Sequence, residues 1–188
     1  MKILVISDTH GSLDRTIKIF SLVENPDLGF HIGDILYHGP RNPIPEDYNP
    51  SKLAEFLRGK KIKYVRGNCD ADVDIMLLGL SEIPRVDVEY IENFKILMMH
   101  GDQLNENDIL DVLKRHKCNV LIHGHTHIPK ILKKEGFVIF NPGSPSIPKK
   151  GNGSFGVIEI AKNLMIFKLL NMKGDVLEEL TFSLEGKN

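Results

Sequence analysis

The sequence lacks several features that would assign it to a specialised class. Its two cysteines, Cys69 and Cys118, are too few for a disulfide framework and are not spaced as in a zinc knuckle. Basic and acidic residues are nearly balanced, at 24 against 25, so the charge indicates neither a nucleic-acid nor a membrane partner. The first apolar run, residues 3–6, is too short for a signal peptide or a membrane span. We therefore expect free thiols, a reducing compartment and a cytoplasmic location.

What is present is ordinary globular composition. The chain has 188 residues, of which 41% are hydrophobic and 26% charged. This length and composition predict one domain over residues 1–188, whose hydrophobic core is large enough to be stable without a disulfide or a structural metal. No internal repeat, low-complexity tract or linker interrupts it, and disorder is expected only at 185–188.

The first half of the chain alternates between strand and helix patterns, whereas the second half is mostly strand. Strands are expected at 2–7, 28–32, 62–65, 86–90, 95–99, 120–122, 137–140, 154–160, 163–169 and 175–183, and helices after Ser12, at 51–59 and after Asn105. Ser12 is expected to cap the first helix, whose apolar side would carry Leu13, Ile17, Phe20, Leu22 and Val23. This mixture predicts an α/β chain with sheets flanked by helices in one layered domain.

Five apolar strands each run into a short polar cluster of metal-ligand residue types. The clusters are Asp8 with His10, Asp34 after Gly33, Asn68 after Gly67, His100 before Gly101, and His125 with His127 after Gly124. In open α/β sheets, binding sites form at the carboxyl ends of strands, where loops meet. We therefore expect these clusters to gather at one edge of the fold, although they lie far apart in the sequence.

This ligand set indicates a particular chemistry. Carboxylate oxygen together with imidazole nitrogen suits manganese, iron or zinc, and the near absence of thiolates argues against a structural zinc site. Seven ligands are too many for one such ion and fit two ions that share a carboxylate. A bridged pair about 3.5–4 Å apart can clamp the attacking and leaving oxygens of a phosphoryl displacement and can supply hydroxide near neutral pH. The pattern predicts a two-metal phosphoesterase.

The same residues, in the same order, carry a resemblance. Asp8-Thr9-His10, Gly33-Asp34, Gly67-Asn68-Cys69-Asp70, His100-Gly101 and Gly124-His125-Thr126-His127 resemble the signature of the calcineurin-like metallophosphoesterases over nearly the whole chain. The stretches 33–42 and 141–149 resemble, more narrowly, the small bacterial phosphodiesterases of the YfcE type. The resemblance implies a four-layer αββα sandwich of two mixed sheets flanked by helices. It also implies phosphodiester hydrolysis with two divalent ions, with manganese preferred over iron, zinc or nickel.

The resemblance also implies a role for each residue. Asp8, His10, Asp34 and His127 would hold the first metal, and Asp34 would bridge to a second metal held with Asn68, His100 and His125. A metal-bridging hydroxide would attack phosphorus, with Asp34, Asn68 and His100 as the catalytic residues and His100 near the developing charge. A homodimer or higher homo-oligomer is expected, and the apolar stretch 72–80 would be either core or part of that contact.

One position departs from the broader superfamily. Many relatives have a histidine after the asparagine, where it can protonate the leaving group, whereas this chain has Cys69. A thiol with an ordinary pKa of about 8.5 is a poor acid for this purpose and is better interpreted as packing. Asp70 would then lack its usual partner. We expect slow reaction with poor leaving groups and tolerance for good ones.

Three further residues are candidates for contact with the substrate phosphate. Arg41 and His38 lie in the proline- and glycine-rich loop 36–50, where a solvated loop or an oligomer contact is an equal alternative. Arg66 precedes the Gly67-Asn68 turn, where a structural ion pair is the stronger alternative. Among the other histidines, His31 and His116 are expected to be structural and His123 is left open. The Asn141–Ser144 turn is expected to line the rim of the site.

Two other functions compete with a phosphodiesterase. A phosphomonoesterase or nucleotide hydrolase could use the same site, because metals recognise phosphoryl oxygen and not the rest of the substrate. A non-catalytic scaffold is the second alternative, since the eukaryotic retromer scaffold subunit resembles this fold with part of the ligand set lost. The complete set here, including His100, argues against a scaffold.

Overall fold

The structure, a computed structural model, describes residues 1–184, and the disorder expected at 185–188 lies outside the described residues. Its elements follow the predicted alternation of strands and helices and then the run of strands. Their order is β1 (Lys2–Ile6), α1 (Leu13–Leu22), β2 (Leu28–His31), α2 (Pro50–Leu57), β3 (Ile62–Tyr64), α3 (Asp72–Leu77), β4 (Val86–Ile91), β5 (Phe94–Met99), the 3₁₀ turn η1 (Glu106–Asp108), α4 (Ile109–His116), β6 (Val120–Ile122), β7 (Lys130–Lys134), β8 (Phe137–Asn141), β9 (Ser154–Ala161), β10 (Leu164–Asn171) and β11 (Val176–Ser183).

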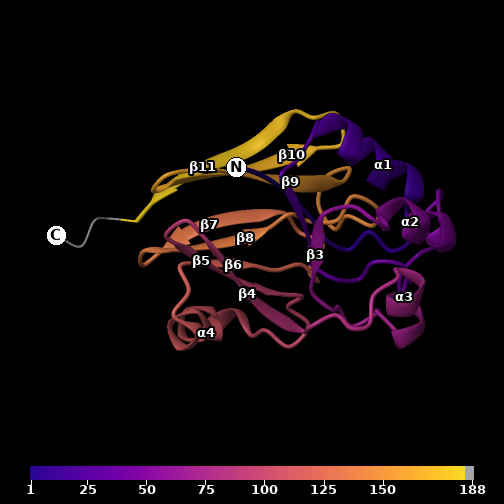
Figure 1. The fold of residues 1–188 in the computed structure, drawn as a ribbon, viewed down its shortest axis with the longest axis horizontal. Coiled ribbons are helices and arrows are strands. Elements are labelled where there is room, and N and C mark those ends of the chain that lie inside the picture. The colour runs from indigo at the N-terminus through magenta and orange to yellow at the C-terminus, as the bar shows by residue number, and fades with distance from the viewer. Residues whose placement is uncertain (185–188) are drawn as a thin grey trace.

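These strands form two mixed sheets that stack face to face (Figure 1). The first sheet has the strand order β11-β10-β9-β1-β2-β3, and the second has the order β4-β5-β6-β8-β7. Strands β1, β2 and β3 run parallel to one another, as do β5, β6 and β8. Parallel strands end at the same edge of their sheet, so the loops that follow β1, β2, β3, β5 and β6 can meet.

Alternation along the strands divides the apolar side chains between the layers. Ile3 and Val5 of β1 face the second sheet and share one core with Val120 and Ile122 of β6, whereas Leu4 faces the outer side of the first sheet. There Leu4 packs with Ile19 and Val23 at α1, and on the opposite outer face Leu97 and Leu121 pack against Ile109 and Leu113 of α4. The result is the expected four-layer αββα sandwich.

The start of α1 differs from the prediction. Ser12 occupies the N-cap position, but its side chain makes no capping hydrogen bond. Its hydroxyl instead donates to the carboxylate of Asp47, 2.7 Å away, and Asp47 Oδ2 accepts the backbone N–H of Arg15 at 3.0 Å. The cap of α1 therefore comes from the long loop 36–50, and the expected capping role of Ser12 is wrong.

Three other local expectations need correction. Ile17 and Leu22 are 41% and 38% exposed, because Thr16, Ile19 and Val23 form the buried face of α1. His116, expected to be structural, is exposed at the end of α4. Strand β7 was not predicted at all, because its Lys-rich sequence Lys130–Lys134 follows an edge-strand pattern with one buried residue.

The apolar stretch 72–80 is only partly core. Ile75 and Leu78 are buried against α2 in a satellite core, whereas Val73 and Met76 are 68% and 73% exposed. Asn105 accepts a hydrogen bond from the backbone N–H of Asn107 and so caps the short turn η1 that leads into α4. None of the helices in residues 1–184 is long and apolar enough to cross a membrane.

Candidate metal centre

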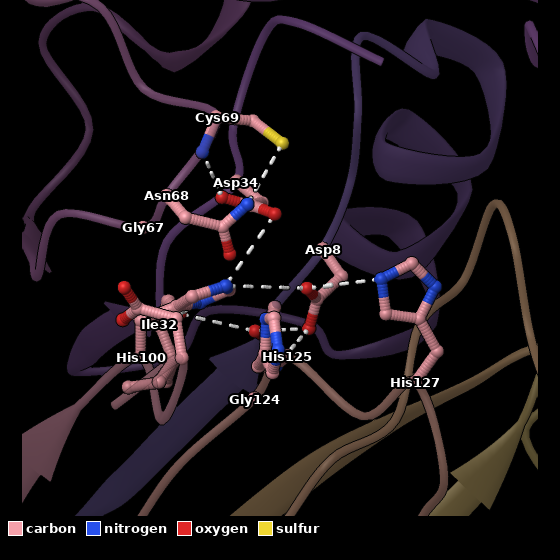
Figure 2. Close-up of polar contacts among 12 residues, drawn as sticks. Asp8, Ile32, Asp34, Gly67, Asn68, Cys69, His100, Gly124, His125 and His127 are labelled. Atoms are coloured by element: carbon pink, nitrogen blue, oxygen red, sulfur yellow. Dashed lines mark hydrogen bonds and ion pairs between the residues drawn. The ribbon is translucent and has the colours of Figure 1, made fainter. Parts of the chain in front are cut away.

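The predicted ligand clusters meet at one edge of the sandwich, where strands of both sheets end (Figure 2). Asp8 and His10 follow β1, Asp34 follows β2, and Asn68 follows β3, all from the first sheet. The second sheet supplies three histidines, His100 after β5 and His125 and His127 after β6. The prediction that these strand ends gather is therefore confirmed by the topology of the sheets.

The backbone at these loops is held in an uncommon conformation. Asp8, His10, Asp34, His125 and His127 have φ angles of 54°, 46°, 54°, 66° and 56°, all in the left-handed region. Residues with a Cβ seldom adopt this region, and strained positions of this kind gather at functional sites. The turns aim successive side chains inward, so a residue such as Asp8 can share a site with His10 two positions later.

Hydrogen bonds from backbone carbonyls fix the orientation of three imidazole rings. The Nδ1 atoms of His10, His100 and His127 lie 2.8, 2.7 and 2.6 Å from the carbonyl oxygens of Tyr37, Ile32 and Ile147. A carbonyl can only accept, so each Nδ1 carries the hydrogen and donates it. When the ring is neutral, each Nε2 then presents a lone pair to the site, which is how metal-binding histidines are commonly held.

The free ring nitrogens converge on two carboxylates. Asp8 Oδ1 lies 3.2 Å from His127 Nε2 and 3.9 Å from His100 Nε2. Asp34 Oδ2 lies 3.4 Å from His100 Nε2 and 3.8 Å from His10 Nε2. Three groups of possible ligand atoms result, each with all atoms within 4.8 Å: Asp8–His10–His127, Asp8–Asp34–His100 and His10–Asp34–Cys69. Asp8 belongs to the first two groups, and Asp34 Oδ2 lies near His100 of one of them and near His10 of the other.

Two buried atoms of this cluster make no hydrogen bond. They are Asp8 Oδ1 and His100 Nε2, on side chains that are fully shielded from solvent. Buried polar atoms nearly always have a partner, and an unsatisfied one requires an explanation such as an ion. Carboxylate oxygens and imidazole nitrogens are the donors that divalent transition metals use. The residues present therefore fit a metal centre.

The carboxylates and the imidazoles of this cluster shift one another's pKa values. Burial alone would raise the pKa of Asp34, but the His100 imidazole, whose Nε2 lies 3.4 Å from Asp34 Oδ2, holds it well below the ordinary value. Conversely, burial alone would lower the pKa of His100, but Asp34 and Asp8 raise it to about 9. Burial would likewise raise the pKa of Asp8, which His127 and His100 lower instead, and the pKa of His127 rises in return. Without a cation, protons on these histidines balance the two carboxylates.

Asn68 and His125 complete the set at its open side. His125 is half-buried, its ring meets that of His100 edge-on at 5.2 Å, and its backbone N–H donates to Asp8 Oδ2 at 3.1 Å. Asn68 is exposed, and its side-chain amide donates to Cys69 Sγ at 3.3 Å. Both line a cavity of about 630 Å³ together with Asp34 and His127. Four of the seven predicted ligands therefore line this cavity, whereas Asp8, His10 and His100 are buried and are not among its lining residues.

The three candidate substrate contacts occupy different places. Arg41 lines the cavity, as does Lys149 on the opposite loop. His38 is not among the lining residues, and its ring lies between those of Tyr37 and Tyr48 at 4.7 and 5.3 Å. Arg66 also lies outside the lining. Its guanidinium pairs with Asp72 at 2.8 Å and donates to the carbonyl oxygen of Asp70 at 2.9 Å, which is the structural alternative foreseen for it.

Asp70, which Cys69 leaves without its usual histidine partner, has other partners in the backbone. Its buried carboxylate accepts the backbone N–H groups of Asp34, Ile35 and Gly67 at 2.9, 2.7 and 2.8 Å. Burial raises the pKa of Asp70 to about 6, although these three donors oppose the rise. Asp70 therefore joins the loop that carries Asp34 to the loop that carries Asn68. The motif offered a signal for this role, because an aspartate beside a tight turn often accepts backbone amides.

Cys69 lies closer to the ligands than its interpretation as packing implied. Its backbone N–H donates to Asp34 Oδ1 at 2.8 Å, and its sulfur falls within 4.8 Å of ligand atoms of His10 and Asp34. Burial, followed by the nearby charge of Asp34, raises the pKa of this thiol to about 12. The thiol therefore stays protonated near neutral pH and is a very weak acid.

A further layer of hydrogen bonds supports the ligands from behind. Thr9 Oγ1 lies 2.9 Å from Nε2 of the buried His31 and donates to the carbonyl of Ile35. Ser144 and Ser146 donate to the carbonyl oxygen of Asp8 at 2.8 and 2.9 Å. The 141–144 turn is thus buried behind Asp8 and not at the rim, which corrects that expectation, whereas the structural role of His31 agrees with its burial.

His123, left open by the sequence, lies outside the groups of metal-ligand atoms. Its ring is buried and Nδ1 lies 3.2 Å from the carbonyl oxygen of Gly124 and 3.4 Å from the amide nitrogen of Asn141. These contacts beside Gly124 and Asn141 give His123 a structural place.

Comparisons with known proteins identify relatives of this chain. The model of the calcineurin-like phosphoesterase superfamily domain matches residues 1–163. The chain is 38% identical to phosphodiesterase YfcE of Escherichia coli over 172 residues, which cover 85% of this chain and 88% of that protein. It is 30% identical over 189 residues to a probable metallophosphoesterase of Methanothermobacter thermautotrophicus, covering 97% of this chain and 99% of that one.

Solved structures show the same architecture. The structure of YfcE, described as a phosphoesterase from E. coli, superposes with a TM-score of 0.81 at 33% identity and covers 96% of this chain and 98% of its own. Vps29 of Chaetomium thermophilum shares the fold, with a TM-score of 0.72 at 18% identity over 98% of this chain and 99% of its own. With the ordered motifs gathered at one buried cluster, this chain belongs to the calcineurin-like phosphoesterase superfamily and is a metallophosphoesterase.

Proposed function

We propose that this protein hydrolyses phosphodiesters with two divalent metal ions. The observation that carries the proposal is the position of Asp34 Oδ2, which lies 3.4 Å from His100 Nε2 and 3.8 Å from His10 Nε2 and so is near a histidine of each proposed metal set. The preference for diesters is supported by the name of the relative from E. coli, phosphodiesterase YfcE.

The residues divide into two metal sets around Asp34. Asp8, His10, Asp34 and His127 would hold one ion, and Asp34, Asn68, His100 and His125 the other, with manganese preferred over iron, zinc or nickel. Such a pair supplies Lewis-acid charge and hydroxide near neutral pH. Asp34 sets the spacing of the two sets, and Cys69 N–H and Asp70 hold Asp34 in place. Asn68 and His100, which belong to the second set, would stabilise the charge that develops on the phosphoryl group.

The cavity walls would orient the substrate. Arg41 and Lys149 line the cavity from two different loops and present cations toward a phosphodiester anion. An Arg fork can bind two phosphate oxygens at once, so Arg41 is the stronger candidate for orienting the phosphate. His38 would act on the substrate only through the shape of the loop, since its ring is held between Tyr37 and Tyr48.

The test is turnover of an aryl phosphodiester, bis(p-nitrophenyl) phosphate, with and without manganese. The native protein should be active only with a divalent metal, and Asp34→Asn and His100→Ala should keep the fold by circular dichroism but lose most turnover. An active Asp34→Asn enzyme at saturating metal would contradict the bridging role. Elemental analysis, or anomalous scattering from crystals, would count the ions and identify them.

Two alternatives give different results in the same assay. A phosphomonoesterase or nucleotide hydrolase would turn over p-nitrophenyl phosphate or a nucleotide faster than the diester. A scaffold of the retromer-subunit type would turn over none of these with any divalent metal, and the likeness to Vps29 supports only a shared fold.

We also propose a homodimer in the cytoplasm. The exposed Val73 and Met76 of α3 form an apolar patch that a second copy could cover. Light scattering would show a dimer for the native chain and a monomer for a Val73→Asp, Met76→Asp variant. A monomeric native chain would remove the proposal.

A further inference from the structure

A second large cavity lies outside the metal centre. It has a volume of about 640 Å³ and shares no lining residue with the metal cavity. Three segments surround it: the first turns of α1, the glycine-rich turn 150–154, and the turn between β10 and β11. The β10–β11 turn lies beyond residue 163, which is the last residue that the family model matches. Figure 1 shows the β10–β11 turn beside α1. Neither the metal chemistry nor the family match assigns a role to this cavity.

Four cations line this cavity, and no carboxylate does. They are Arg15, Lys18, Lys150 and Lys173. None of the four has an acidic partner within 4.0 Å in the described part of the chain. In a chain with a net charge of −1, so many unpaired positive charges around one hollow create a local field that favours an anion.

Arg15 is held ready for a ligand. Its Nη1 donates to the carbonyl oxygens of Pro145 and Asn152 at 2.9 and 3.4 Å, which fixes the guanidinium between α1 and the glycine-rich turn. Its Nε and Nη2 groups donate to nothing else in residues 1–184. A guanidinium that is already positioned can offer its remaining N–H groups to a phosphate at a small entropic cost.

The glycine-rich turn adds backbone donors. Gly151 and Gly153 have φ angles of +71° and +101°, and the backbone N–H groups of Gly151, Asn152 and Gly153 donate to no group in residues 1–184. Successive free amides in a turn of this kind form concave anion sites. A Cβ at Gly153 would meet Pro145 O at 2.7 Å, so glycine is required for the turn to pack here.

The cavity also has an apolar part. Pro129, Met172 and Leu177 line it, and Leu177 is 56% exposed. Cavities of about 300–1,000 Å³ suit small organic ligands, and a mixed lining selects a ligand with one charged and one apolar end. We propose that this cavity binds a small organic anion with two phosphate groups, of the size of a nucleoside diphosphate, at a site separate from the metal centre.

The test is calorimetric titration of metal-free protein with adenosine 5′-diphosphate and, separately, with inorganic pyrophosphate at low salt. The diphosphate should bind more tightly than pyrophosphate, because only the nucleoside contacts the apolar residues. A Lys18→Glu, Lys173→Glu variant should bind the diphosphate at least tenfold more weakly. Its matched control is Lys134→Glu, Lys162→Glu, which reverses two exposed lysines on other elements and should bind like the native chain.

Several outcomes would overturn the proposal. The proposal fails if neither probe binds, if both charge-reversal variants bind the diphosphate equally well, or if pyrophosphate binds as tightly as the diphosphate. It also fails if His100→Ala abolishes binding, because the anion would then bind at the metal centre. Turnover of bis(p-nitrophenyl) phosphate by the Lys18→Glu, Lys173→Glu variant should equal that of the native protein. A failure of the binding proposal can therefore be distinguished from a failure of the proposed hydrolysis.

Discussion

Four of the candidate metal ligands are fixed twice, by a left-handed backbone and by a hydrogen bond to the side chain: Asp8, His10, Asp34 and His127. His127 illustrates this, with φ at 56° and Nδ1 held 2.6 Å from the carbonyl oxygen of Ile147. The residue types and their order were predicted from the sequence, because each cluster follows an apolar strand. The carbonyl partners were not, since a carbonyl twenty residues away leaves no mark in the side-chain pattern.

Cys69 determines how well a poor leaving group can be protonated. Because the pKa of its thiol is raised to about 12, it cannot serve as an effective acid near neutral pH. Cys69→His should therefore raise kcat for an alkyl phosphodiester relative to an aryl one by about tenfold or more, within the range of general-acid catalysis. Cys69→Ser, which keeps the size but adds no suitable acid, is the control. An unchanged alkyl-to-aryl ratio in Cys69→His would refute the argument.

Asp70 is a positioning residue for Asp34. In Asp70→Asn one acceptor oxygen becomes an NH₂ group that faces a backbone N–H, so the free energy of unfolding should fall by about 1–3 kcal/mol. Metal affinity should fall by about 10–100-fold, as for other groups that orient ligands. The neighbouring Asp72, whose side chain is 87% exposed, provides the control. Asp72→Asn should change stability by less than about 0.5 kcal/mol, and equal effects of the two variants would contradict the role of Asp70.

At the scale of elements, helix α1 depends on a loop that is distant in sequence. Asp47 accepts the N–H of Arg15, and the backbone N–H of Leu13 donates to the carbonyl of Asp47. The sequence indicated the position of the helix but not its cap, because Ser12 satisfied the local rule as well. Only the tertiary approach of loop 36–50 decides which side chain takes the cap.

Asp47→Ala should lower the free energy of unfolding by about 1–2 kcal/mol, the usual cost of losing a cap. Chemical denaturation would measure it, with Glu46→Ala, an exposed neighbour in the same loop, as the control. The same loop supplies the Tyr37 carbonyl that holds His10. Because Asp47→Ala would loosen this loop, the variant should also bind the metal more weakly. If Glu46→Ala and Asp47→Ala were equally stable, loop 36–50 would not cap α1.

At the scale of the whole molecule, two stacked sheets bring chemistry from both halves of the chain to one edge. The strand alternation of Ile3, Leu4 and Val5 is enough to predict layers. The pairing of the sheets is not predictable from periodicity, since nothing local shows that β1 lies between β2 and β9. Here the four-layer arrangement was implied only by the resemblance, and β7 was missed because an edge strand rich in lysine lacks an apolar pattern.

Protonation should govern metal binding to the whole fold. The pKa of His100 is raised from 6.5 to about 9, so the stability it contributes to the metal-free protein is complete below pH 6.5 and is lost as the pH rises toward about 9. A metal ion must displace that proton, so its affinity should rise by up to about tenfold for each pH unit over this window. Competition with a chelating indicator at several pH values measures this. His100→Ala should show a shallower slope, and a flat native profile would contradict the coupling.

The left-handed turns of the ligands imply a trade-off between stability and activity. Each non-glycine residue in this region costs about 1–2 kcal/mol, and five of the seven ligands occupy it. At the half-buried His125, glycine should therefore give a more stable protein than alanine by about 1 kcal/mol, although both lose a ligand. At the adjacent Thr126, which has no positive φ, the order should reverse, as thermal unfolding of the four variants would show. The metal centre is thus a region where selection for activity has kept a fold less stable than the same chain could be.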